Sequence, residues 1–140
     1  MNIRQWLGRA RSIDAEMKAL EIAKEKAEAA ALKITQSYDG DGATSTKDPH
    51  KLDRIVVFID LLDQKKQELI ETQREITEAI YKLDDGRQRT TLLNYYVNLM
   101  TLEEISVQMH YSYRQTKRIK NRATEALEQR GLECPHDSVV

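Results

Sequence analysis

The chain has 140 residues, with 22 basic and 23 acidic side chains, 40% hydrophobic residues, five glycines and two prolines. This composition is typical of a helix-rich protein with a modest core and disfavours a β sandwich, which needs more turns. The longest apolar run, Ile55–Ile59, is too short to span a bilayer, and the N-terminus lacks the apolar region of a signal peptide, so we expect a cytoplasmic protein without membrane contact. Cys134 has no partner for an internal disulfide, and with His136 it offers too few ligands for a metal.

Two segments repeat apolar residues at alternating spacings of three and four. They cover about residues 2–36 and 49–83, and each predicts a long helix with one narrow apolar seam, as in a coiled coil. Polar residues within such a seam commonly set its register. The seam residues are Ile3, Trp6, Ala10, Ile13, Met17, Leu20, Lys24, Ala27, Ala31 and Ile34, then Leu52, Ile55, Ile59, Leu62, Lys66, Leu69, Gln73, Ile76, Ile80 and Leu83.

The segment between the two repeats, residues 37–48, is rich in Gly, Asp, Ser and Thr and predicts a loop. Asp48 followed by Pro49 favours a helix start there. A loop of this length, at about 3.3–3.6 Å per residue, is too short to carry the chain back for parallel pairing. We therefore expect residues 1–83 to form a long antiparallel two-helix hairpin. Two surface helices of a larger bundle are the alternative.

A second domain is predicted for residues 84–130, followed by a tail at 131–140. After the turn signal "DDGR", a helix is expected from about residue 87 to 97. "TLEE" and "SYRQ" each have the pattern of a capping box, and they predict helices at 102–109 and 112–128. Only His110 to Ser112 separate the two. A short helix, a tight turn and a longer helix have the geometry of a helix-turn-helix.

The last helix is unusually basic at its start. Residues 111–123 hold five Lys or Arg and no acid, and an inward stripe of Thr116, Ile119 and Ala123 turns most of these cations outward. Arg and Lys can read guanine, Asn can read adenine, and further cations can bind phosphates. The pattern therefore predicts binding to double-stranded DNA. The expected base contacts are Tyr113, Arg114, Lys117, Arg118 and Asn121, and the expected backbone contacts are Thr101, Ser112, Lys120 and Arg122.

Residues 87–127 resemble region 4 of the bacterial sigma-70 family, on the segments "TLLNYYVNLMTLEEIS" and "YSYRQTKRIKNRATEAL". The whole chain is similar to small regulators of late transcription in phages and prophages of Firmicutes, akin to the ArpU and RinA groups. The resemblance implies an all-α fold whose last helix reads a promoter's −35 element. Nothing resembles sigma regions 2 or 3, so we do not expect this chain to initiate transcription alone. Tyr113 stands where sigma factors commonly have Arg, which leaves the preferred DNA sequence open.

The expected function is thus that of a phage or prophage transcriptional regulator. The sequence leaves two partners open: RNA polymerase, and a second copy of the chain in a homodimer formed through the hairpin. Two other functions compete with it: a small terminase subunit, which is a ring-forming DNA-packaging adaptor, and an anti-sigma or adaptor protein whose basic helix meets an acidic partner. We expect no enzyme and no cofactor, because the sequence has no phosphate-binding glycine loop, no clustered ligand set and no nucleophile elbow.

Overall fold

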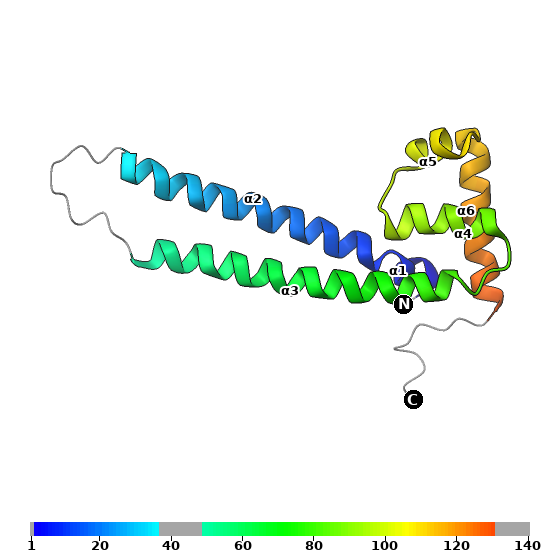
Figure 1. Cartoon of the computed structure of the whole chain (residues 1–140), viewed down its shortest axis with the longest axis horizontal. Helices are drawn as coiled ribbons and strands as arrows, with labels where there is room; N and C mark the ends of the chain where they lie inside the picture. Colours follow the sequence, from blue (N-terminus) through cyan, green and yellow to red (C-terminus); the bar gives the residue numbers. More distant parts are fainter. Residues whose placement is uncertain (1, 37–48, 131–140) are drawn as a thin grey trace, which may run out of the picture. The chain divides into compact units, whose positions relative to one another are not determined.

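The computed structural model describes residues 2–36 and 49–130, and every regular element in these ranges is a helix (Figure 1). The all-α class is therefore confirmed. The predicted loop 37–48 with Asp48, and the predicted tail 131–140 with Cys134 and His136, lie outside the described residues. Among the helices that are described, none combines the length and the apolar character needed to cross a membrane. The residues group into two compact units, Ile13–Glu68 and Met1–Ser12 with Leu69–Val140.

The first predicted helix is two helices, α1 (Ile3–Leu7) and α2 (Arg9–Gln36). The single helix expected over residues 2–36 is therefore corrected at Gly8. Arg9 Nε donates to the Trp6 carbonyl at 3.0 Å, and this carbonyl would otherwise serve a continuous helix. Glycine also weakens a helix, and a Cβ at Gly8 would lie 3.2 Å from the Arg4 carbonyl oxygen.

The unit Ile13–Glu68 consists of parts of α2 and α3 (Pro49–Ile80), which run in opposite directions (Figure 1). Glu16 and Lys65 join the two helices through an ion pair of 2.7 Å, and Glu16, followed by Glu68, raises the pKa of Lys65. In the described part of this unit, Ile13 is the only apolar residue that is buried, whereas Ile59 keeps 46% of its surface exposed. The predicted seam is therefore only partly covered within this unit.

The other unit contains the main hydrophobic core. Both ends of the predicted hairpin enter this core together with the C-terminal helices, and the compact units are divided at Ser12 and Leu69. The C-terminal helices therefore share their core with the start of the chain. The buried core residues are Ile3, Trp6, Leu7, Ala10, Ile76, Ala79, Ile80, Leu83, Leu92, Tyr96, Ala123 and Leu127.

Two predicted helices differ from the observed ones near the middle of this unit. The helix expected to reach residue 83 ends at Ile80, and Leu83 N–H then bonds to the Ile80 carbonyl at 3.0 Å in a tighter turn. Leu83 nevertheless stays buried. The helix expected over 87–97 is α4 (Gly86–Leu92) followed by a π-helical turn, η2 (Leu93–Val97).

The last two helices agree closely with the sequence prediction. α5 (Leu102–Met109) and α6 (Tyr113–Gln129) begin with the two expected capping boxes, in which Thr101 pairs with Glu104 and Ser112 with Gln115. His110 ends α5 with a φ of 60°, a left-handed conformation that histidine tolerates better than most side chains. α6 packs against α4, α5 and α1.

Candidate nucleic-acid interface

The outward face of α6 carries the side chains expected to read bases. Thr116, Ala123 and Leu127 are buried, and this orientation leaves the opposite side of the helix open to solvent. The exposed or half-exposed residues on that side and at its edges are Tyr113, Arg114, Lys117, Arg118 and Asn121. Acidic residues enter this helix only at Glu125, one turn after Asn121. The first half of α6 therefore presents cations without a neighbouring carboxylate on the same helix.

Thr124 is a buried residue of α6 that the predicted stripe did not include. Its hydroxyl donates to the Lys120 carbonyl at 2.9 Å, so its burial leaves no hydroxyl proton unpaired. Ile119, which the stripe did include, is only half-buried and lines a cavity. The inward side of α6 is therefore rotated slightly from the predicted stripe, towards Thr124.

Lys120 lies on this inward side and differs from the other cations of the helix. Its Nζ is 4.4 Å from the ring centroid of Tyr95 and 5.8 Å from that of Tyr96. Burial, followed by the nearby Arg4, Arg11 and Lys117, lowers the pKa of Lys120. An ammonium group held over two rings is less free to reach a phosphate than an exposed one. The backbone contact expected of Lys120 stays a prediction, and this placement weakens it.

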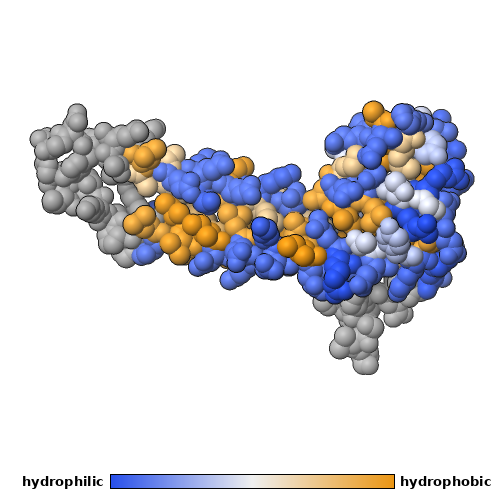
Figure 2. Space-filling model, viewed as in Figure 1, coloured by the Kyte–Doolittle hydropathy of each residue, from blue (hydrophilic) through white to orange (hydrophobic). Residues whose placement is uncertain are grey.

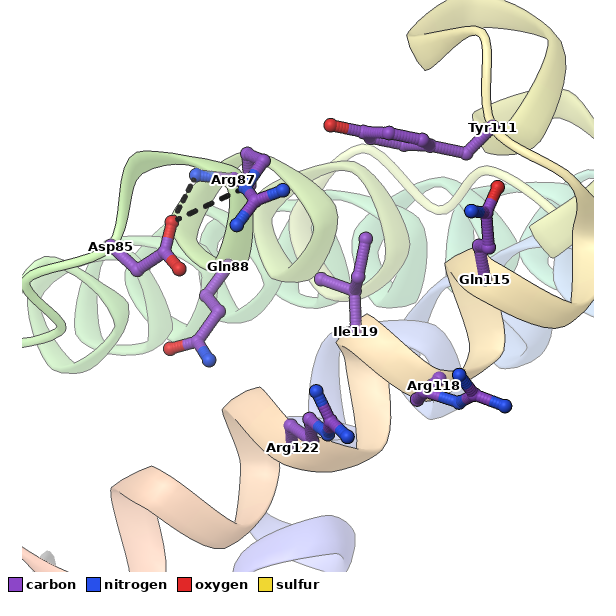
Figure 3. A pocket seen from close by; sticks show the side chains of 8 residues that line it. All are labelled: Asp85, Arg87, Gln88, Tyr111, Gln115, Arg118, Ile119 and Arg122. Atoms are coloured by element: carbon purple, nitrogen blue, oxygen red, sulfur yellow. Dashed lines mark hydrogen bonds and ion pairs between the residues drawn. The ribbon is translucent and has the colours of Figure 1, made fainter.

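Arg122, the other expected cation for the DNA backbone, is exposed and lines a cavity of about 230 Å³ between α4 and α6 (Figure 3). Arg87 of α4 lines the same cavity, and the Tyr111 hydroxyl, followed by Asp85, raises the pKa of Arg87. Arg87 was not among the predicted site residues. In the sequence, Arg87 belongs to the turn signal "DDGR", which does not indicate that α4 places this residue beside α6.

Thr101 and Ser112, the two other expected backbone contacts, are exposed at helix starts. Both hydroxyls accept a hydrogen bond from a backbone N–H, that of Glu104 at 3.2 Å and that of Gln115 at 3.1 Å. Their role within the protein is therefore capping, and their contact with DNA stays a prediction.

Arg4 and Arg11 join the site from the other end of the chain, and sequence reasoning missed both. Arg4 Nη1 donates to Asn121 Oδ1 at 3.4 Å, across 117 positions of sequence. Arg11 lies with its guanidinium carbon 4.2 Å from the ring centroid of Tyr95. No periodic pattern links residues so far apart. The packing of α1 on α6 brings Arg4 to Asn121, and Arg11 reaches Tyr95 of η2 from α2.

The comparisons with known proteins give a family but no function. Residues 30–128 match the family described as "Protein of unknown function (DUF1492)", and the chain therefore belongs to this family. No curated protein and no solved structure matches the chain. In the part of the chain that the structure describes, no group of His, Cys, Asp or Glu is arranged to hold a metal ion.

Proposed function

We propose that this member of the DUF1492 family is a sequence-specific double-stranded DNA-binding protein, and that it acts as a phage or prophage transcriptional regulator. The observation that supports this most is the outward face of α6, where Arg114, Lys117 and Arg118 are exposed and no acid of the helix precedes Glu125. Such a face suits a helix that enters the major groove, where base edges offer acceptors to Arg and Lys and phosphates border both sides.

The proposal treats α5, its turn and α6 as a helix-turn-helix. Three features support this interpretation: α5 and α6 pack together, three residues separate them, and the left-handed His110 ends α5 sharply. In this geometry the residues near the start of the second helix contact base edges. Tyr113, Arg114, Lys117 and Arg118 occupy those positions, and Asn121 follows one turn later.

The proposed phosphate contacts lie at the side of α6 that faces α4. Arg122 and Arg87 line one cavity there (Figure 3), so two helices supply cations to the same place. Cations in such a position neutralise the DNA backbone and hold the reading helix in register.

We assign the antiparallel pair of α2 and α3 to association between copies of the chain. Ile13 is the buried apolar residue of the unit Ile13–Glu68 in its described part, while large apolar side chains remain on its surface (Figure 2). Two helices with so little buried surface gain from further partners, and two-fold dimers are the commonest soluble assemblies. Such a dimer would present two reading helices to DNA. In the described part of this unit, the large apolar residues that are exposed are Ile22, Leu32, Leu52, Val56, Val57, Ile59 and Leu61.

The test begins with selection of a preferred site from random duplexes. Arg114→Ala and Arg118→Ala are then titrated against the selected duplex and a scrambled one at a fixed salt concentration. Loss of a base contact costs on the order of 1–3 kcal/mol on the selected duplex and less on the scrambled one. Arg122→Ala is the matched control, because a lost phosphate contact weakens both duplexes equally.

Two outcomes contradict the proposal. If no duplex is enriched and none binds at low salt, the protein is not a DNA-binding protein, and an acidic protein partner becomes the better hypothesis. Equal losses on both duplexes for all three variants would mean that α6 only follows the DNA backbone, and the promoter-reading role would have to be given up.

A further inference from the structure

A second group of cations lies beside α6, on the flank that faces the start of the chain. It comprises Arg4 of α1, Arg11 of α2, and Lys117 and Lys120 of α6. Arg11 and Lys120 both lie over the ring of Tyr95, at 4.2 Å and 4.4 Å from its centroid. α1 packs on α6, and the hydrogen bond from Arg4 to Asn121 belongs to this contact.

This group is a concentration of like charge. Among the described residues, the ion pairs with carboxylates involve other basic residues and none of these four. Burial and the other three cations of the group together lower the pKa of Lys120, because they disfavour the positive charge of its ammonium group. An anion bound at this flank would relieve the repulsion, since opposite charges a few ångströms apart attract strongly near a protein surface.

Internal contacts account for Arg11 and Lys120 but not for Arg4. Arg11 donates to the carbonyls of Tyr95 and Met100, and the ammonium of Lys120 lies on aromatic rings. Arg4 is exposed, and the hydrogen bond that its side chain donates within the described residues is the long one of 3.4 Å to Asn121. Its guanidinium therefore keeps donors available at the edge of the outward face of α6.

We propose that Arg4 binds a phosphate of the DNA backbone, on the strand opposite the one that meets Arg87 and Arg122. This inference rests on the proposed function and adds α1 to the DNA interface. The major groove is about 12 Å wide and has a phosphate strand on each side. Arg4 of α1 meets α6 at Asn121, whereas Arg87 of α4 shares a cavity with Arg122 of α6, so a helix in the groove would carry a cation to each strand.

The experiment compares Arg4→Gln with Arg54→Gln, a change at an exposed arginine of α3 in the other compact unit. Binding of the full chain to the selected and scrambled duplexes is measured over a series of salt concentrations. For Arg4→Gln, the slope of log K against log salt should become shallower by about 0.9, the value for one lost phosphate contact. Both duplexes should lose affinity by the same factor. Arg4→Lys should keep the slope, and Arg54→Gln should match the wild type.

An unchanged slope for Arg4→Gln would overturn the inference. A loss confined to the selected duplex would overturn it too, because Arg4 would then act by orienting Asn121. Arg114→Ala, measured in the same series, distinguishes a failure of this inference from a failure of the proposed function. If Arg114→Ala weakens the selected duplex while Arg4→Gln leaves the slope intact, only this inference fails. If the wild type binds neither duplex at low salt, the proposed function fails and this inference falls with it.

Discussion

Arg11 and Tyr95 lie 84 positions apart in the sequence, yet the Arg11 side chain both covers the Tyr95 ring and donates to the Tyr95 carbonyl at 2.9 Å. The same guanidinium nitrogen donates to the Met100 carbonyl at 2.9 Å. Carbonyl groups in the last turn of a helix, and those just beyond it, have no N–H partner within that helix. A residue from the start of the chain therefore caps the end of η2.

Arg11→Ala should destabilise the protein by about 2 kcal/mol, because it removes hydrogen bonds from a charged donor and a cation–π contact. Urea unfolding followed by circular dichroism measures this loss. Arg11→Lys keeps the charge but loses the forked donors of the guanidinium group. Its free energy of unfolding should therefore lie between those of the wild type and Arg11→Ala. A change within about 0.5 kcal/mol for Arg11→Ala, the usual range for surface substitutions, would show that the cap is dispensable.

The C-terminal helices should not fold without the start of the chain. Trp6 is only 5% exposed and belongs to the same core cluster as Leu92 and Leu127. Trp6→Ala should therefore cost about 3–5 kcal/mol in the free energy of unfolding. Leu32→Ala, at a side chain 59% exposed, is the control and should change stability little. Cooperative melting of a fragment of residues 84–130 alone would contradict this prediction and support the domain boundary expected from the sequence.

Ile59→Asp should dissociate the proposed dimer while leaving most of the helix content in place. Ile59 is 46% exposed within one chain, so the new carboxylate would reach solvent in the monomer but be buried in a dimer. Sedimentation equilibrium gives the mass, and circular dichroism gives the helix content. Ile76→Asp is the contrasting variant and should unfold the core, because Ile76 is fully buried.

A wild-type chain that stays monomeric at micromolar concentration would exclude the dimer. A mass of eight or more subunits would instead favour a ring-forming packaging adaptor.

Glu104 should make stability depend on pH at the low end. The Thr101 backbone N–H, followed by the Thr101 hydroxyl, holds the pKa of Glu104 below its ordinary value of 4.5. The pKa of Glu104 is lower in the folded state than in the unfolded state. The stabilisation by the Glu104 carboxylate is therefore complete above pH 4.5, and it is lost as the pH falls through the pKa of the folded state. Glu104→Gln keeps an acceptor and does not titrate. The Tm difference between wild type and Glu104→Gln should therefore shrink on acidification, and a constant difference would contradict this assignment.

Binding to DNA should weaken steeply as salt rises. If about five phosphates are contacted, the slope of log K against log salt should be about −4 to −5. A flat dependence would remove the electrostatic part of the proposal. Lys120→Ala is unsuitable for this measurement, because loss of its contacts with Tyr95 and Tyr96 should also lower stability.

Features set by neighbours in sequence were accessible from the sequence alone. Thr101 with Glu104 and Ser112 with Gln115 place two helix starts, and each pair lies within one turn of helix. Pro49 begins α3 as expected. In the two capping pairs, a side chain bonds to a backbone N–H three residues away, so local chemistry is sufficient.

Tertiary packing decided what the periodic patterns could not. The sequence predicts that Lys120 contacts the DNA backbone, but its ammonium group lies over Tyr95 and Tyr96. Nothing near Asn121 in the sequence indicated Arg4. Each of these contacts depends on helices that meet across the core. Their positions are fixed by which apolar side chains are buried together, and a repeat within a single helix carries no information about its partners.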